Sequence, residues 1–149
     1  MIEEHANRYY LPEHFDVSFR PFLGTRKRVR FDGLQLVCRL SLWRRVRVCP
    51  SVRAWGAFWQ EMDEVRLWQW NATYRPAPNS VVYDGLRWNV EIIHGERQIT
   101  SEGHNAYPGN SENTPRGPYS ASPDKAQESA RFRKFREALH RLTGVDLFG

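Results

Sequence analysis

Apolar and polar residues alternate through residues 15–49, which is the pattern of β-strands with one buried face. A first run ends at Pro21, because proline cannot donate a hydrogen bond to a neighbouring strand. Further runs cover residues 28–31, 34–42 and 45–49, and the last of these places Arg and Val on opposite faces. The N-terminal third is therefore predicted to form several short strands.

Two Asp-Gly pairs mark predicted hairpin turns. Asp32-Gly33 and Asp84-Gly85 each separate strand-like runs. Asp-Gly favours a two-residue type I′ turn, in which both central residues need positive φ. Leu23-Gly24-Thr25 is a further predicted turn between strands.

Residues 51–65 carry apolar side chains at helical spacing. Ser51 is the predicted N-cap, because its hydroxyl can accept from free amides of the first turn. The expected apolar stripe consists of Val52, Trp55, Phe58, Trp59, Met62 and Val65. Glu61, Asp63 and Glu64 follow in the last turn, where acids oppose the helix dipole and are expected to be solvated. Gly56 indicates close approach of the helix to a strand.

An antiparallel meander is expected after this helix. Aromatic and polar residues alternate from Trp68 to Tyr74, and a clearer alternation covers residues 86–92. His94-Gly95-Glu96 is a predicted turn that leads into a returning strand at 97–101. Connections this short usually join antiparallel neighbours, so these strands are expected to lie side by side.

The last predicted element is a helix that follows a long loop. Residues 103–122 are rich in Gly, Pro, Ser and Asn, and loops beyond about 12–15 residues are usually functional or mobile. Ser122-Pro123-Asp124 is the predicted helix start and Gly144 the predicted stop. Its apolar face consists of Phe132, Phe135, Leu139 and Leu142.

These elements predict an α+β fold in a single domain, residues 1–149. An antiparallel sheet, made of the N-terminal strands and the meander, is expected to pack against two main helices, the second at the C-terminus. A chain of 149 residues is long enough for one core and too short for two ordinary domains. Residues 1–14 are expected to be flexible.

Part of the chain resembles a motif series found in small bacterial proteins of unassigned function. The series consists of Trp55 and Phe58, Trp68-Gln69-Trp70 and Tyr74, Tyr83-Asp84-Gly85 and Trp88, Ser101 and Gly103, Asn105-Ala106-Tyr107-Pro108, and an amphipathic C-terminal helix. The resemblance covers about residues 54–143 and leaves the basic N-terminal third unmatched. It implies the layout of the fold and no activity.

The composition excludes several classes of protein. With 40% hydrophobic and 26% charged residues, the chain is not a disordered tail, a coiled coil or a collagen-like fibre. Two cysteines are too few for a disulfide framework, so a cytoplasmic location is expected. Cys38 and Cys49 are expected to be buried free thiols, with one disulfide between them as the alternative. Residues 1–10 lack a secretory pattern and no apolar run reaches about 18 residues, so no membrane contact is expected.

Positive charge is concentrated in one segment. The chain carries a net charge of +5, but residues 20–53 contain ten Lys or Arg and a single acid, whereas residues 54–115 carry net −4. Guanidinium groups suit planar contacts with phosphate or carboxylate, and an exposed aromatic beside them can stack on a base. The candidate partner-binding or nucleic-acid-binding residues are Arg26, Lys27, Arg28, Arg30, Trp43, Arg44, Arg45 and Arg47. A solvated face that blocks edge aggregation is the alternative.

A second basic group lies on the C-terminal helix. Its members are Arg131, Arg133, Lys134, Arg136 and Arg141. Such a helix can lie across phosphates or an acidic protein surface, and a solvated outer face is the alternative.

No recognised catalytic motif is present. The chain lacks a nucleophile elbow, a phosphate-binding loop and a dinucleotide fingerprint, and His94, His104 and His140 lack the spacing of a zinc-protease helix. We therefore expect no enzymatic activity, no cofactor and no metal site. An enzymatic alternative would combine His94 or His104 with Glu91 or Asp84.

Aromatic residues suggest two further alternatives. Trp88, His104 and Tyr107 could line a small pocket where the last predicted strand ends. If the C-terminal helix leaves Trp68 and Trp70 uncovered, that strand face would be a protein-binding hot spot.

The sequence thus predicts a small non-catalytic binding protein that recognises a macromolecule through an arginine-rich strand face. The expected partner is an acidic protein surface or a nucleic acid. The runner-up function is direct nucleic-acid binding, in which the same arginines contact phosphates. By analogy with other short, single-domain proteins without catalytic motifs, the protein would be a phage or mobile-element inhibitor or accessory factor.

Overall fold

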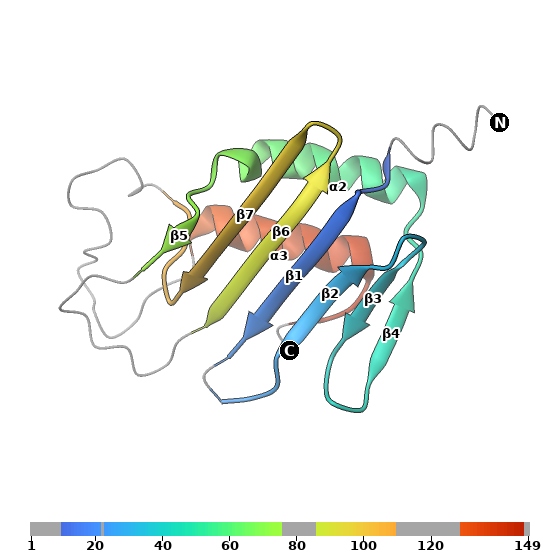
Figure 1. The fold of residues 1–149 in the computed structure, drawn as a ribbon, viewed down its shortest axis with the longest axis horizontal. Coiled ribbons are helices and arrows are strands. Elements are labelled where there is room, and N and C mark those ends of the chain that lie inside the picture. Colours follow the sequence, from blue (N-terminus) through green and yellow to red (C-terminus); the bar gives the residue numbers. More distant parts are fainter. Residues whose placement is uncertain (1–9, 22, 76–85, 110–128, 148–149) are drawn as a thin grey trace.

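The structure, a computed structural model, describes residues 10–21, 23–75, 86–109 and 129–147, which form a seven-stranded sheet with two helices on one face (Figure 1). The strands are β1 (His14–Arg20), β2 (Lys27–Phe31), β3 (Leu36–Arg39), β4 (Arg45–Val48), β5 (Thr73–Tyr74), β6 (Arg87–His94) and β7 (Arg97–His104). The two helices are α2 (Val52–Glu64) and α3 (Ala130–Thr143), and a short 3-10 turn, η1 (Leu67–Gln69), follows α2. The α+β class predicted from the sequence is confirmed.

The sheet is continuous, with the strand order β4-β3-β2-β1-β6-β7-β5. Strands β1 to β4 form the predicted N-terminal hairpins, and β6 pairs with β7 as predicted. Strand β1 pairs along its whole length with β6, from His14↔Ile93 to Arg20↔Arg87. This pairing joins the N-terminal strands to the C-terminal half of the chain, and it sets the layout of the open face described below.

The turn between β2 and β3 differs from the predicted type I′ hairpin. The strand pairing leaves a four-residue loop, 32–35. The Asp32 carboxylate accepts hydrogen bonds from the amides of Leu34 and Gln35, each at 2.9 Å. Among these four residues only Gly33 has positive φ, at 103°. The aspartate side chain therefore closes the turn, as in an Asx-turn. The second predicted Asp-Gly turn, Asp84-Gly85, lies outside the described residues.

The predicted strand from Trp68 to Tyr74 is wrong for most of its length. Its first part is the 3-10 turn η1, and only β5 at its end is a strand, which pairs in parallel with β7 rather than in an antiparallel meander. Arg66 adopts a left-handed conformation (φ 54°) that turns the chain just after α2. The indole of Trp70 then donates to the carbonyl of Val65 at 2.9 Å, which holds this segment against the end of the helix.

A serine caps the N-terminus of each helix. Ser51 caps α2 as predicted, and its hydroxyl accepts from the amide of Ala54. Helix α3 begins at Ala130, where Ser129 is the N-cap, and ends at Gly144, which takes φ 69°. The start predicted at Ser122-Pro123-Asp124 lies outside the described residues.

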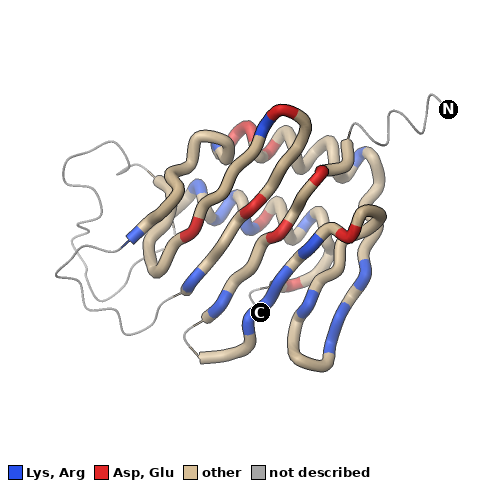
Figure 2. The backbone as a smooth tube through the Cα atoms, viewed as in Figure 1, with Lys and Arg blue, Asp and Glu red and all other residues tan. Residues whose placement is uncertain are grey.

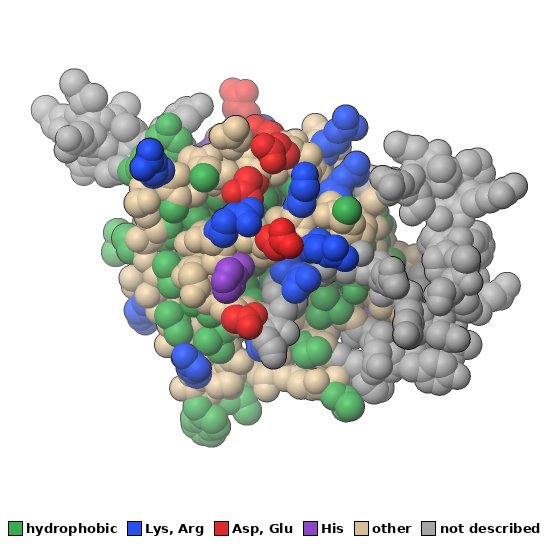
Figure 3. All heavy atoms as spheres, turned by 180° about the vertical axis from the view of Figure 1, so that it is seen from behind, with side chains coloured by type: hydrophobic (Ala, Val, Ile, Leu, Met, Phe, Trp, Pro, Cys, Tyr) green, Lys and Arg blue, Asp and Glu red, His purple; other side chains and the backbone are tan. Residues whose placement is uncertain are grey.

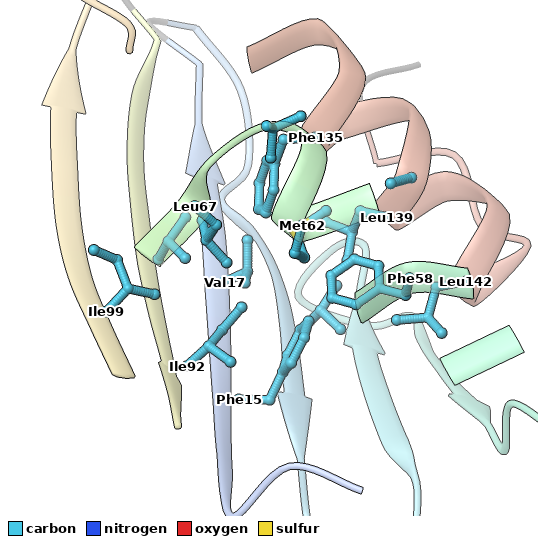
Figure 4. Packing of buried hydrophobic residues seen from close by; sticks show 14 of the residues in the cluster. Phe15, Val17, Phe58, Met62, Leu67, Ile92, Ile99, Phe135, Leu139 and Leu142 are labelled. Atoms are coloured by element: carbon cyan, nitrogen blue, oxygen red, sulfur yellow. The ribbon is translucent and has the colours of Figure 1, made fainter. Parts of the chain in front are cut away.

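The core lies between the helices and one face of the sheet (Figure 4). It contains the predicted stripe of α2, apart from Val52, which is exposed, and the predicted apolar face of α3. The rings of Phe15 on β1 and Trp55 on α2 meet edge to face, with centroids 5.9 Å apart. Trp88 is fully buried against Phe132, so it does not line the pocket considered from the sequence.

Two regions predicted as flexible or as loops are partly in strands. β1 already begins at His14, and β7 continues to His104, whereas residues 1–9 and 110–122 lie outside the described residues. A Cβ added to Gly103 would lie 2.4 Å from the indole nitrogen of Trp88, so glycine is required at this position. At Gly56 the close neighbour is the ring of Tyr10, at 3.3 Å from an added Cβ, and not a strand as predicted.

The two cysteines are free, and they differ in environment. Cys38 is buried as predicted, whereas Cys49 is exposed. Burial raises the pKa of the Cys38 thiol to about 11. Within the described ranges, no helix is long and apolar enough to cross a membrane.

Candidate anion-binding face

The strand register places most of the predicted arginines on the face of the sheet that points away from the helices, and Figure 2 shows where Lys and Arg occur along the strands. On β2, Val29 is fully buried and Phe31 contacts Trp55 of α2. Side chains alternate along a strand, so Arg28 and Arg30 project from the opposite face. The same alternation on β3 and β4 adds three more arginines to this face. We call these five residues the arginine grid: Arg28, Arg30, Arg39, Arg45 and Arg47.

The strand register arranges the grid in two cross-strand rows. Arg28 lies opposite Arg39, and Arg39 lies opposite Arg45, so one row contains three arginines. In the neighbouring row the central position is Val37, between Arg30 and Arg47. The short valine leaves a hollow of about 330 Å³, which the five arginines line together with Phe31 and Asp32.

The row of three arginines brings like charges close together. The amide of Leu40 donates to the carbonyl of Arg44 at 3.0 Å, and hydrogen-bonded and non-bonded pairs alternate along antiparallel strands. Arg39 and Arg45 are therefore a non-hydrogen-bonded pair, whose Cα atoms are about 4.5 Å apart and whose side chains approach most closely. Like charges directly opposite each other destabilise a sheet, by roughly 0.2–1 kcal/mol per pair.

Acidic neighbours neutralise the grid only at its borders. Arg28 makes a bidentate contact with Asp16 on β1, with N to O distances of 2.8 and 2.5 Å. Arg47 lies 3.6 Å from Asp32. Arg30, Arg39 and Arg45 form no ion pair with any described residue. The centre of the grid is therefore positively charged.

The two carboxyl groups beside the grid, Asp16 and Asp32, have lowered pKa values. Partial burial alone would raise the pKa of Asp16, but the hydrogen bonds and charge of Arg28, with the charges of Arg30 and His14, outweigh it and lower that pKa. The pKa of Asp32 is lowered mainly by the backbone amides of its own turn. Both acids therefore remain ionised at neutral pH.

Not all of the predicted binding residues belong to the grid. Arg26 lies beside it and donates to the hydroxyl of Ser18 at 3.1 Å. Trp43 and Arg44 lie in the loop that joins β3 to β4, and the Trp43 side chain is 93% exposed. Lys27 pairs opposite Phe19, which contacts α3, so Lys27 projects toward the helix side and is separate from the grid.

The second predicted basic group is on the other side of the molecule. Seen from the helix side, acidic and basic side chains are intermingled (Figure 3). Arg141 of α3 forms an ion pair with Glu61 of α2, and Arg97 pairs with Asp63 at 2.5 Å. These two acids, predicted to be simply solvated, are thus ion-pair partners. The residues Arg131, Arg133, Lys134 and Arg136 all belong to α3 and do not extend the grid.

Sequence reasoning missed three basic residues on the open face. Arg39 belongs to the grid, and its place opposite Arg45 could be read from the alternation of the second hairpin. Arg20 pairs opposite Arg87 of β6, and Arg87 pairs opposite His104 of β7. Partial burial, Arg87 and Arg75 together lower the pKa of His104. No local pattern brings Arg20 and Arg87 together, because they lie on strands that are far apart in the sequence.

The enzymatic alternative gains no support from this geometry. His94 stacks on Trp59 of α2 with centroids 4.0 Å apart, so it projects from the face opposite to that of Glu91. His104 shares the open face with Glu91 but lies four residues away along the strands, about 13 Å. Asp84 is outside the described residues.

One group of side chains has the composition of a metal site. His14, Asp16 and Glu91 bring ligand atoms within 4.8 Å of one another. Arg28, however, occupies both carboxylate oxygens of Asp16, and its charge disfavours a cation. This group is better described as part of the ion-pair network beside the grid.

Comparisons with protein-family models, curated proteins and solved structures gave no match for this chain. The resemblance of residues 54–143 to small bacterial proteins therefore stays a prediction, and the function is argued from the site alone.

Proposed function

We propose that the chain is a non-catalytic binding protein that holds an anionic macromolecule on its arginine grid. The observation that carries this proposal is the row Arg28, Arg39 and Arg45, in which Arg39 and Arg45 face each other without an acidic partner among the described residues and only Arg28 is paired, with Asp16. This arrangement destabilises the free protein. A bound anion would remove the repulsion, and so the row is best explained by a partner that neutralises it.

Protection of a sheet edge does not account for the grid. Charged side chains on an edge strand discourage aggregation, and Arg45 and Arg47 of β4 lie at one end of the strand order. Arg28, Arg30 and Arg39 lie on interior strands, where both edges are already paired. Three of the five arginines thus need another explanation.

The grid has the chemistry for contacts with phosphate or carboxylate groups. Guanidinium groups present five N–H donors in a planar fork that matches such anions. Val37 forms a low floor between the longer arginines, so an anionic group can enter the hollow of about 330 Å³ and meet donors from several strands. Because the hollow is open to solvent, we propose a macromolecular partner that covers it.

Retention on immobilised heparin tests this proposal. We expect the double variant Arg39→Gln and Arg45→Gln to elute at clearly lower salt than the unaltered protein, because two unneutralised charges are lost. The matched control is Arg66→Gln, an exposed arginine after α2 that lies outside the sheet. A second comparison changes Arg133 and Lys134 of α3 to Gln. If the α3 variant loses retention while the grid variant keeps it, the proposal is wrong.

A further inference from the structure

We propose that the partner of the arginine grid is a single-stranded nucleic acid, whose phosphates follow a band of basic residues across the open face. This inference rests on the proposed function. The band is a cross-strand row in which His104, Arg87 and Arg20 lie side by side on β7, β6 and β1. Arg26, which contacts Ser18 beside Arg20, links the row to the grid at Arg28.

The band crosses most of the sheet. From β7 to β4 there are five spacings between neighbouring strands, or about 24 Å at roughly 4.8 Å each. Figure 2 shows Lys and Arg toward the same end of the strands from β6 to β4. Folds that bind single strands cover about 4–16 nucleotides, and a band of this length suits the lower end of that range.

Charges in the band are available to a ligand. Arg20 and Arg87 form no ion pair with any residue that the structure describes. The charges of Arg87 and Arg75 contribute to lowering the pKa of His104, although Arg75 itself forms an ion pair with Glu102. The positive character of the grid therefore extends to Arg87 on β6, well beyond the segment with the highest charge in the sequence.

Carboxylates beside the band favour a narrow partner over a broad acidic surface. Asp16 is already paired with Arg28. Glu102 and Glu91 lie on the same face, two residues from His104 and four residues from Arg87 along their strands, or about 7 and 13 Å. A wide acidic protein surface would be pressed against these carboxylates. A chain of phosphates can lie along the band and avoid them.

An exposed indole lies where the band ends. Trp43 is in the loop between β3 and β4, next to Arg44, and its side chain is 93% exposed. Nucleic-acid bases stack on such side chains when they are unpaired, whereas a duplex keeps its bases stacked inside. The indole thus favours a single strand.

The exposed leucines do not form a membrane-docking end. Leu23 and Leu42 lie in the two loops at this end of the hairpins, but Leu34, in the loop at the opposite end, is exposed to a similar extent. An interfacial surface would gather its apolar side chains on one side.

The test is fluorescence anisotropy with labelled dT20 and U20 across a salt series. Each neutralised phosphate of a single strand contributes about −0.7 to the slope of log K against log salt concentration. We expect a slope of about −3 or steeper for the unaltered protein, which corresponds to four or more phosphates. The double variant Arg20→Gln and Arg87→Gln should lose about 1.4 from this slope and bind at least tenfold more weakly at low salt. Trp43→Ala should weaken binding about tenfold.

Control variants keep the test independent of folding. Arg66→Gln should bind like the unaltered protein, and the double variant Arg20→Lys and Arg87→Lys should restore most of the affinity. Unchanged binding of dT20 and U20 by the Gln double variant would overturn the inference. So would tighter binding of a 20-base-pair duplex, of polyglutamate, or of phosphatidylserine vesicles than of both single strands.

The outcomes also separate this inference from the proposed function. If neither single strand binds but heparin retention still depends on Arg39 and Arg45, the inference fails and the proposed function stands. If heparin retention is independent of the grid as well, both fail.

Discussion

Replacing Arg39 by glutamine should make the free protein more stable, although it removes a residue of the proposed binding site. Arg39 faces Arg45 on one side and Arg28, which is paired with Asp16, on the other, so the substitution relieves one unneutralised like-charge pair and one that Asp16 partly neutralises. At up to about 0.2–1 kcal/mol per pair, the relief amounts to roughly 0.2–2 kcal/mol. Glutamine keeps most of the aliphatic stem but loses part of its packing. We therefore expect a net gain of about 0.5–1 kcal/mol in the free energy of unfolding at low salt.

Urea unfolding followed by tryptophan fluorescence measures this gain, since the chain contains six tryptophans. Salt supplies an internal check, because the Debye length falls from about 10 Å at 0.1 M to about 3 Å at 1 M. The stabilisation should shrink as salt is added. Arg66→Gln, which lacks a cross-strand arginine, should change the free energy of unfolding by less than about 0.5 kcal/mol at every salt concentration.

Two results would show that charge repulsion does not destabilise the Arg39 position. One is a loss of stability in Arg39→Gln at low salt, which would mean that the arginine stabilises the sheet through its packing. The other is a gain that does not depend on salt, which would mean that its origin is not electrostatic.

Three further substitutions or probes test neighbouring parts of the account. Asp16→Asn should lower the free energy of unfolding by about 1 kcal/mol yet tighten heparin retention, because Arg28 loses its counter-charge; weaker retention would contradict this. Because the pKa of Asp16 is lowered in the folded protein, its ion pair stabilises the fold fully above the unfolded-state pKa of about 3.9. This stabilisation is lost as the pH falls through the folded-state pKa. In urea titrations between pH 5 and pH 2, Asp16→Asn should therefore lose less stability than the unaltered protein. Gly103→Ala should destabilise by about 3 kcal/mol in thermal or urea unfolding, because an added Cβ overlaps the core, and a near-neutral result would show that this corner can relax. Ellman's reagent should titrate one thiol, Cys49, in the native protein and a second, Cys38, only in denaturant; two native thiols would contradict the burial of Cys38.

Much of the fold could be predicted because the strands have clear local patterns. Alternation at period two identified β1, β2, β3, β4 and β6, and the turn after β6 identified β7. Apolar residues at helical spacing identified α2, with its cap Ser51, and the apolar face of α3. Alternation predicted a strand between Trp68 and Tyr74 that is mostly absent, because the two tryptophans alternate here to pack against the end of α2 and not to form a strand. The indole N–H groups of Trp68 and Trp70 donate hydrogen bonds to the Asp63 carboxylate and the Val65 carbonyl at the end of α2. The chain therefore turns where a strand was expected.

The binding face could be predicted only in part. The charge of residues 20–53 identified its position. The alternation of side chains along a strand could also have shown that Lys27 lies on the opposite face from Arg26 and Arg28. The extension through Arg20 and Arg87 depends on the pairing of β1 with β6. No short connection signals such a pairing, because strands that are distant in sequence are matched by the whole core and not by a local turn.

The open face and the helix face divide the basic residues between two surfaces with different electrostatics. On the helix side, charges are paired between elements, as in Arg141 with Glu61. On the open side, Arg30, Arg39 and Arg45 form no ion pair with an acid among the described residues. This difference, and not the total charge of +5, is the physical basis for placing the partner on the sheet.

The most direct test of the central claim is a nuclear magnetic resonance titration of the ¹⁵N-labelled protein with dT20 at low salt. The largest amide shifts are predicted on β2, β3 and β4 at Arg28, Arg39 and Arg45, and they should reverse when salt is raised. Shifts confined to α3, around Arg133 and Lys134, would place the anion on the helix face and contradict the account.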